Sequence, residues 1–215
     1  MIRSNLAILM AALAVGACAS APTIEERPPS GEVAPIERPV LEPGRIREEI
    51  SMIDGSARGY EVLGVLDDGS IRGRSSWKEG CKWVVPADWF SPDNSWEDCG
   101  TGSWSTGANT VISSSGDDLW PLRDGTSAKW SYRSRRSTGE GGRNTRRCKV
   151  SGPVAITVRV GDVNAMKVVC RDVWGGGPDG ETKTWYWTSE HGVVKYTRVH
   201  SKRGLEDDNE LVAVR

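Results

Sequence analysis

The most regular feature of the chain is an alternation of apolar and polar residues, which predicts β-strands and almost no helix. Residues 59–66 alternate in this way and lead into Asp-Asp-Gly-Ser at 67–70, a typical hairpin turn. Further strands are expected at 128–134, 145–151, 154–160, 164–174, 182–189, 193–200 and 210–215, with Gly-containing turns between them. Strands at this spacing predict an all-β fold: a curved antiparallel sheet, a sandwich or a partly open barrel.

Two stretches depart from this pattern. Residues 45–52 fit either a short helix or the first strand. Residues 86–117 are rich in Ser, Gly, Asp and Trp and show little periodicity, so we expect a long irregular excursion there. Ordered loops of this length often carry binding residues.

The segment 184–196, Thr-Trp-Tyr-Trp-Thr-Ser-Glu-His-Gly-Val-Val-Lys-Tyr, predicts a hairpin with an aromatic patch. Trp185 and Trp187 share one face of their strand because side chains alternate. A two-residue turn at 191–192 would pair Trp187 with Tyr196, whereas a three-residue turn would pair it with Lys195. The patch is either part of the core, which aromatic pairs on strands favour, or a ligand-binding surface.

The N-terminus has the features of a secretory signal. A nearly unbroken apolar run from Leu6 to Val15 is too short for a membrane-spanning helix. The following Val-Gly-Ala-Cys resembles the lipobox of bacterial lipoproteins, which implies removal of residues 1–17 and lipidation of Cys18 with acyl chains such as palmitate. The alternative is an ordinary signal cut near Ala19 or Ala21. Ala19, in place of Asp, resembles the signal of Gram-negative outer-membrane lipoproteins, so the resemblance implies a lipid anchor facing the periplasm.

Residues 18–44 are rich in proline and charge and have no apolar period, so we expect a disordered, solvated tether. Residues 45–215 have the length of one domain, which is large enough to bury a core. The formal net charge of −1 gives no overall attraction to nucleic acid, and we expect no nucleic-acid partner.

Four cysteines remain when Cys18 is set aside, and an even number in an exported chain predicts two disulfides. We expect Cys81–Cys99 and Cys148–Cys170. The second pair raises a geometric difficulty, because the expected strand 154–160 would lie between the two strands that carry the cysteines. Zinc is disfavoured because there is no Cys-x-x-Cys motif and the two histidines are not spaced as ligands. We therefore expect no metal and no cofactor.

The second half of the chain resembles a group of small, uncharacterised proteobacterial envelope lipoproteins. The resemblance rests on Leu-Trp-Pro-Leu at 119–122, Gly125, Trp-Ser-Tyr at 130–132, Lys-Val-Val-Cys at 167–170, Trp-Tyr at 185–186 and Gly-Val-Val-Lys-Tyr at 192–196. It covers roughly residues 117–200 and implies a β-sheet domain. It brings no catalytic residues with it.

Tryptophan is the unusual component of the composition, with ten Trp against one Phe. Trp adds an N–H donor and a broad flat face, which suit stacking on sugars or an interface hot spot. We expect Trp89, Trp96 and Trp104 of the irregular excursion, together with Trp185 and Trp187, to be binding candidates. The alternative is that the loop tryptophans fold inward and form a small core of their own.

A basic hairpin supplies the second group of candidates. Residues 128–150 hold eight Lys or Arg and one Glu. The forked guanidinium groups of Arg133, Arg135 and Arg136 suit carboxylates and phosphates. The alternative is a solvated strand pair balanced by the acidic stretch 206–210.

Catalysis is disfavoured, because no Gly-x-Ser-x-Gly motif is present and the paired acids lie in expected loops. We therefore expect a non-catalytic module that binds peptidoglycan or another envelope glycan. One alternative is an accessory subunit of an envelope protein complex, and a less favoured one is a hydrolase of cell-wall glycan.

Overall fold

The computed structural model describes residues 24–76, 78–139 and 141–215. The predictions for the signal peptide and for lipidation of Cys18 lie outside these residues. The all-β prediction is confirmed: the regular structure of the described residues consists of twelve antiparallel strands and one short 3-10 helix, η1 (Gly102–Trp104). The strands are β1 (Ile46–Ser51), β2 (Ala57–Val65), β3 (Ile71–Ser75), β4 (Lys82–Val85), β5 (Asn94–Glu97), β6 (Gly107–Gly116), β7 (Ser127–Arg136), β8 (Gly141–Val158), β9 (Gly161–Trp174), β10 (Gly180–Thr188), β11 (Gly192–His200) and β12 (Gly204–Val214).

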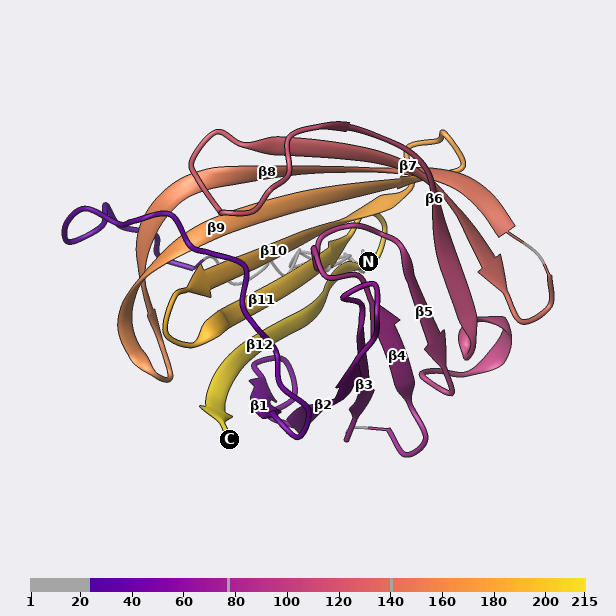
Figure 1. Ribbon diagram of the computed structural model, residues 1–215, viewed down its shortest axis with the longest axis horizontal. Helices are drawn as coiled ribbons and strands as arrows, with labels where there is room; N and C mark the ends of the chain where they lie inside the picture. Colours follow the sequence, from indigo (N-terminus) through magenta and orange to yellow (C-terminus); the bar gives the residue numbers. More distant parts are fainter. Residues whose placement is uncertain (1–23, 77, 140) are drawn as a thin grey trace, which may run out of the picture.

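The strands form a closed barrel in which each strand pairs with its neighbours in the sequence (Figure 1). β1 closes the ring because it pairs with β2 on one side and with β12 on the other. Of the three architectures expected, the barrel is therefore the one formed, and it is fully closed. Closure leaves no unpaired sheet edge, which an open sheet of this length would expose.

In an up-and-down barrel successive connections alternate between the two ends. The β7–β8, β9–β10 and β11–β12 turns and η1 lie at one end, which we call the polar end. The β8–β9 and β10–β11 turns, the start of β1 and the end of β12 lie at the other, which we call the strap end. The two ends hold different side chains, and each has its own cavity.

An apolar core fills the middle of the barrel. Phe90, which the β4–β5 connection carries inward, is fully buried and packs against Trp120, Trp185 and Trp187, with ring centroids 5.5, 5.6 and 6.0 Å away. The other buried residues of this core include Leu119, Leu122, Trp130, Val150, Met166, Val168 and the disulfide Cys148–Cys170. Trp185 and Trp187 are therefore core residues, 9 % and 4 % exposed, as the strand pattern favoured.

Residues 24–44, which we call the strap, do not form a free tether as expected. Most of their side chains are exposed to solvent, but the segment is docked along the barrel (indigo in Figure 1). Arg27 exchanges two backbone hydrogen bonds with Ala155, and Ile36 exchanges two with Leu122. Ile36 is buried in the barrel core, and the Glu26 carboxylate accepts a 2.6 Å hydrogen bond from the Tyr186 hydroxyl. A few well-placed apolar side chains and backbone pairings dock the segment, although its composition is typical of disorder.

Both predicted disulfides are present, Cys81–Cys99 and Cys148–Cys170. The expected strands 145–151 and 154–160 are two parts of one long strand, β8, which has a bulge between Val150 and Pro153. No strand separates the cysteines, because Cys148 of β8 stands directly opposite Cys170 of β9. The geometric difficulty arose from dividing one bulged strand into two.

Three further expectations need correction. Residues 45–52 contain a strand, β1, and not a helix. The expected excursion 86–117 contains β5 and β6, whose Ser- and Gly-rich sequences hide the alternation. Both proposed hairpin registers are wrong, because a bulge after Tyr186 pairs Trp185 with Tyr196 and Trp187 with Val193. A bulge adds a residue to one strand and so shifts the pairing on either side of it.

Candidate functional site

The inward-facing side chains of β7–β10 change from apolar to polar along the barrel. On β8 the inward positions run from Val150 through Cys148 to Arg146 and Asn144. On β9 and β10 the same face carries apolar residues at the strap end and Asp172, Glu181 and Lys183 towards the polar end. Half of the barrel is therefore a packed core, and the other half is a polar chamber.

This chamber is a cavity of about 1070 Å³ that opens at the polar end. Strands β5–β11 and the turns around them contribute its walls. Five basic and two acidic residues line it, together with aromatic and amide side chains: Arg136, Arg146, Lys183, Arg198, Arg203, Asp172, Glu181, Trp96, Trp104, Trp174, Tyr132, Asn94, Asn109 and Asn144.

A buried ion pair forms the floor of the cavity. The Arg146 guanidinium donates to both carboxylate oxygens of Asp172, from Nε and from Nη2, at 2.7 Å each. Its Nη1 donates to the Phe90 carbonyl oxygen at 3.0 Å, which links the polar chamber to the apolar core. Asp172 also accepts from the Tyr132 hydroxyl and from Lys183 Nζ, both at 3.3 Å. Bidentate pairing and the extra donors compensate the cost of burying these charges.

The ion pair fixes the charge states at the floor. Burial on its own would raise the pKa of Asp172, but the charges of Arg146 and Lys183 outweigh it and hold the pKa well below its ordinary value. Burial would lower the pKa of Arg146, and the adjacent Asp172 carboxylate raises it instead. For Tyr132, burial and the Asp172 charge both raise the pKa. A general acid needs a raised carboxyl pKa, so Asp172 is poorly suited to the acid role that a glycan hydrolase requires.

The cationic groups of the side wall are also paired. Lys183 Nζ lies 2.6 Å from a Glu181 oxygen. Arg198 Nε donates to Asp207 at 2.6 Å, and its guanidinium lies within 4 Å of Glu181 and Glu206. A ligand would therefore contact side chains whose positions are fixed by ion pairs. More cations than anions face the cavity.

The mouth of the cavity carries a stack of two tryptophans and an arginine. The rings of Trp96 and Trp104 lie 6.3 Å apart and 22° from parallel, and Trp96 Nε1 donates to the Trp104 carbonyl oxygen at 2.9 Å. The Arg136 guanidinium carbon lies 3.9 Å from the Trp104 ring centroid. Gly107, opposite Trp96 in the register, makes room for this stack, because an added Cβ would lie 2.6 Å from the Trp96 ring. Trp104 is 45 % exposed, so part of the stack is accessible to solvent.

Neutral amides line the cavity between the floor and the mouth. Asn109 Nδ2 donates to Asn94 Oδ1 at 2.7 Å, and Asn144 Nδ2 donates to Ser134 Oγ at 2.7 Å. Each amide is oriented by a neighbour and keeps further donor or acceptor capacity. Oriented amides beside an aromatic face can bind the hydroxyl groups of a sugar.

The structure divides the candidate residues into three groups. Trp96, Trp104 and Arg136 come together at the mouth of the polar cavity. Arg133 and Arg135 lie on the same strand as Arg136 but on its exposed outer face. The other tryptophans, Trp89, Trp185 and Trp187, belong to the core or to the strap end.

Several cavity residues were not among the candidates. Arg146, Asp172, Lys183 and Arg198 stand on strands at positions where alternation points inward. The sequence does contain a signal for these inward-facing charges: a charged residue that shares the alternation phase of apolar residues. Arg146 is an example, in the series Asn144, Arg146, Cys148 and Val150.

Two features are absent from the described part of the chain. There is no group of three or more His, Cys, Asp or Glu placed to hold a metal ion. No helix there is long and apolar enough to cross a membrane.

Comparison with known proteins gives two distant structural likenesses. No family model matches the sequence, and no curated protein matches it. A Bacteroides fragilis protein described as exported, with a YmcC-like fold, aligns with a TM-score of 0.43 at 9 % identity over 81 % of this chain and 96 % of its own. The hypothetical lipoprotein YmcC of Escherichia coli aligns with a TM-score of 0.45 at 7 % identity over 85 % of this chain and 90 % of its own. Likenesses at this level establish neither a family nor a function for the chain.

Proposed function

We propose that the protein is a lipid-anchored envelope module that binds a glycan at the polar end of its barrel without catalysing a reaction. The observation that carries the proposal is the stack of Trp96, Trp104 and Arg136 at the mouth of a cavity of about 1070 Å³. The cavity is large enough for several sugar rings, since pockets for small ligands begin at roughly 300 Å³.

The chemistry of the lining supports an acidic glycan. A tryptophan face packs against the C–H groups of a sugar ring, and Asn94, Asn109 and Asn144 can bind its hydroxyls. Five cations and two anions line the cavity, and Asp207 and Glu206 pair with Arg198 and Arg203 from outside the lining. The remaining positive charge favours a ligand that carries carboxylates or phosphates. Peptidoglycan, with its carboxylate-bearing sugars and peptide stems, meets these requirements, as does another acidic envelope polysaccharide.

Two features support the location. The lipobox-like sequence ending in Cys18 implies an anchor in the outer membrane, facing the periplasm, where peptidoglycan lies within reach. The two disulfides are typical of proteins that mature in an oxidising compartment.

The test is sedimentation of the purified full-length protein with sacculi at low and high salt, followed by titration with soluble peptidoglycan fragments. Trp104→Ala should weaken binding by about tenfold, because one stacked aromatic contributes roughly 1–3 kcal/mol by alanine substitution in comparable stacking sites. Ile112→Ala is the matched control, since Ile112 is equally exposed but lies on β6 away from the cavity lining.

Arg136→Gln provides a second arm. It should weaken binding and reduce the salt dependence, because Arg136 lines the cavity. Arg133→Gln, a change of the same charge on the outer face of the same strand, should leave binding unchanged. Equal losses from Arg133→Gln and Arg136→Gln would show non-specific attraction to a basic surface. No retention at any salt concentration would rule out peptidoglycan, and acidic oligosaccharides without peptide stems would then be titrated.

One observation favours the alternative of docking on an envelope protein. Leu63, Val65 and Leu66, at the end of β2, are 36 %, 47 % and 38 % exposed. Crosslinking in the intact envelope from these positions should capture a defined protein if this surface is an interface, and should give no discrete product if it faces solvent.

A further inference from the structure

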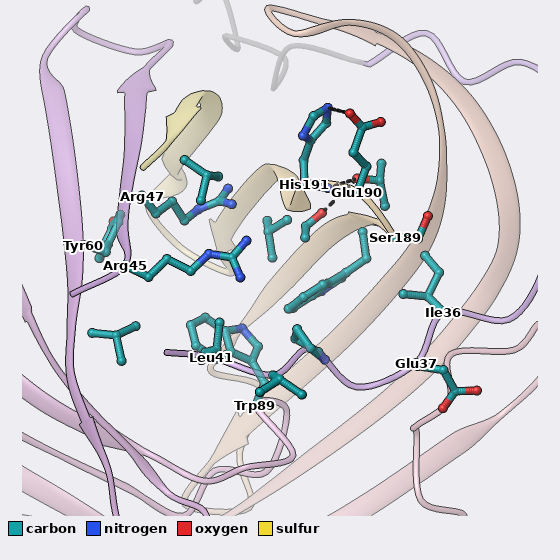
Figure 2. A pocket seen from close by; sticks show the side chains of 18 of the residues that line it. Ile36, Glu37, Leu41, Arg45, Arg47, Tyr60, Trp89, Ser189, Glu190 and His191 are labelled. Carbon is teal, nitrogen blue, oxygen red and sulfur yellow. Dashed lines mark hydrogen bonds and ion pairs between the residues drawn. The ribbon is translucent and has the colours of Figure 1, made fainter. Parts of the chain in front are cut away.

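The strap end holds a second cavity, of about 310 Å³, between the strap and the barrel (Figure 2). Strap residues 36–41 form one side, and the start of β1 and the β10–β11 hairpin form others. No residue lines both this cavity and the polar one. The second cavity is therefore a separate site, closed off by the apolar core.

Three tryptophans make one wall of this cavity. Trp89 packs edge-to-face against Trp83, with ring centroids 6.5 Å apart, and against Trp187 at 6.2 Å. Leu41, Val62, Val193 and Val214 extend the apolar lining. Such a wall favours an apolar ligand body over a sugar, because it offers few groups for hydroxyls to bind.

Trp89 is held in an unusual backbone conformation. Its φ of 62° lies in the left-handed region, which a bulky residue rarely adopts. A tight turn imposes this conformation: Trp89 N donates to the Pro86 carbonyl oxygen at 2.9 Å, and the Asp88 carboxylate accepts from Phe90 N at 2.7 Å. Strain of this kind persists where the position of a side chain matters, and here it places the indole ring in the cavity wall.

Two arginines project into the cavity from the start of β1 (Figure 2). Arg47 is already paired, since its Nε lies 2.5 Å from Glu49 Oε1. Arg45 is half-buried, and none of the residues described by the structure forms an ion pair or a side-chain hydrogen bond with its guanidinium. A half-buried cation beside an apolar wall is stabilised by an anion that enters the cavity.

The acidic groups at the rim do not fill this role. Glu37 is exposed and lies across the cavity from Arg45, with its carboxylate pointing away (Figure 2). Glu190 is 81 % exposed at its side chain and lies 3.6 Å from His191 Nε2. The position opposite Arg45 is therefore open to a ligand.

We propose that the strap-end cavity binds a small amphipathic carboxylate, with its apolar body against Trp83, Trp89 and Trp187 and its carboxylate on Arg45. The strap closes over the ligand, because Ile36 and Leu41 flank the cavity while the backbone pairing of Ile36 with Leu122 holds the strap in place. This site is independent of glycan binding at the polar end.

The test is calorimetric titration of the purified full-length protein with dodecanoate and with dodecanol, which has the same chain and no charge. Dodecanoate should bind at least about tenfold more tightly than dodecanol, as expected for one charge-assisted hydrogen-bonded pair. Arg45→Gln should abolish this preference and leave dodecanol binding unchanged. Arg72→Gln, a charge change at an exposed position of β3 outside the cavity, is the matched control.

Two further variants distinguish a loss of the binding site from a loss of the fold. Arg45→Lys should keep part of the preference for dodecanoate, because it keeps the charge. Leu41→Trp should block both ligands by filling the cavity from the strap, with no change in thermal unfolding. Equal affinity for the two ligands in the wild type, an unchanged preference in Arg45→Gln, or no binding of either ligand would overturn the proposal. Displacement of dodecanoate by peptidoglycan fragments would contradict the independence of the two sites.

Discussion

The ion pair of Arg146 and Asp172 is both the floor of the polar cavity and a buried part of the barrel. The side chains are 8 % and 1 % exposed. Removing one partner from such a pair leaves an uncompensated buried charge, which is more costly than the loss of the attraction alone.

We expect Asp172→Asn to lower the free energy of unfolding by about 3–5 kcal/mol at neutral pH, because Arg146 loses its counter-charge. The pKa of Asp172 is lowered in the folded state, so its contribution is complete above the unfolded value of about 3.9 and is lost as the pH falls through and below it. The difference between wild type and variant should therefore shrink on acidification. Urea unfolding at a series of pH values measures this difference.

Asp67→Asn is the control, because Asp67 lies exposed in the β2–β3 turn and the change should have little effect at any pH. A loss for Asp172→Asn that does not shrink with decreasing pH would show that the cost comes from packing and not from the charge.

Part of the site could be predicted at this scale. The sequence identifies Trp and Arg candidates because stacking and forked hydrogen bonding are properties of single side chains, and Trp96, Trp104 and Arg136 do meet in the structure. The sequence could not show which of the basic hairpin residues face inward. The orientation of Arg136 and of Arg133 depends on the phase of β7 relative to the closed barrel, and the phase follows from tertiary packing.

At the scale of elements, strands with a clear apolar–polar alternation were predictable. Bulges and Ser- and Gly-rich strands, which interrupt or hide the alternation, were not. β9, β10 and β11 were located to within a few residues because their apolar periodicity is strong. The sequence did not reveal the bulges in β8 and β11, since a bulge leaves no fixed residue signature there. The docking of the strap was missed because proline-rich composition describes the isolated segment and not its contacts with the barrel.

The strap gives a direct test of this correction. Ile36→Ala should lower the free energy of unfolding by roughly 2–4 kcal/mol, the usual cost of emptying a buried Ile position. Val40→Ala is the matched control in the same segment, because Val40 is 82 % exposed and its truncation should be nearly neutral. Denaturant unfolding monitored by tryptophan fluorescence measures both. Equal and negligible effects would mean that the strap contributes no packing in solution.

The β8–β9 disulfide allows a second prediction. Replacing Cys148 and Cys170 by Ala should cost about 3 kcal/mol, the loop-closure value expected for a sequence separation of 22. The barrel should still form, because thirteen residue pairs already join β8 and β9 in the register. Replacing Cys81 and Cys99, with a separation of 18, should cost a similar amount if chain entropy dominates. Thermal and denaturant unfolding of the two double variants show whether the cost of losing each disulfide comes from chain entropy or from local packing.

At the scale of the whole molecule, the barrel has a cavity at each end, and an apolar core lies between the two cavities. The polar cavity opens between the β7–β8, β9–β10 and β11–β12 turns, and the smaller cavity lies under the strap. Phe90 and the surrounding tryptophans fill the space between them. This division follows from the polarity gradient of the inward positions, which the sequence contains but which becomes visible only when the barrel is closed.

The docked strap also changes how far the barrel can stand from a membrane. If Cys18 carries the lipid, the six residue steps from Cys18 to Ile24 span at most about 20 Å, at roughly 3.3–3.6 Å per residue. A solvated tether through residue 44 would instead reach about 80 Å in polyproline form. From Glu26 onward the strap is attached to the barrel through contacts with Tyr186, Lys167 and Ala155. The docked part of the strap therefore adds nothing to the distance between the membrane and the barrel.

We therefore expect neutron reflectometry of the lipidated protein on a supported bilayer to show a hydrated gap of about 20 Å or less beneath the barrel. Inserting ten Gly and Ser residues between Cys18 and Ile24 should widen the gap. The same insertion between Val40 and Arg45, beyond the docked part of the strap, should leave it unchanged. A gap of several tens of ångströms in the wild type would mean that the strap detaches at the membrane. The strap-end cavity would then open, so its dodecanoate affinity on the bilayer should fall together with the docking.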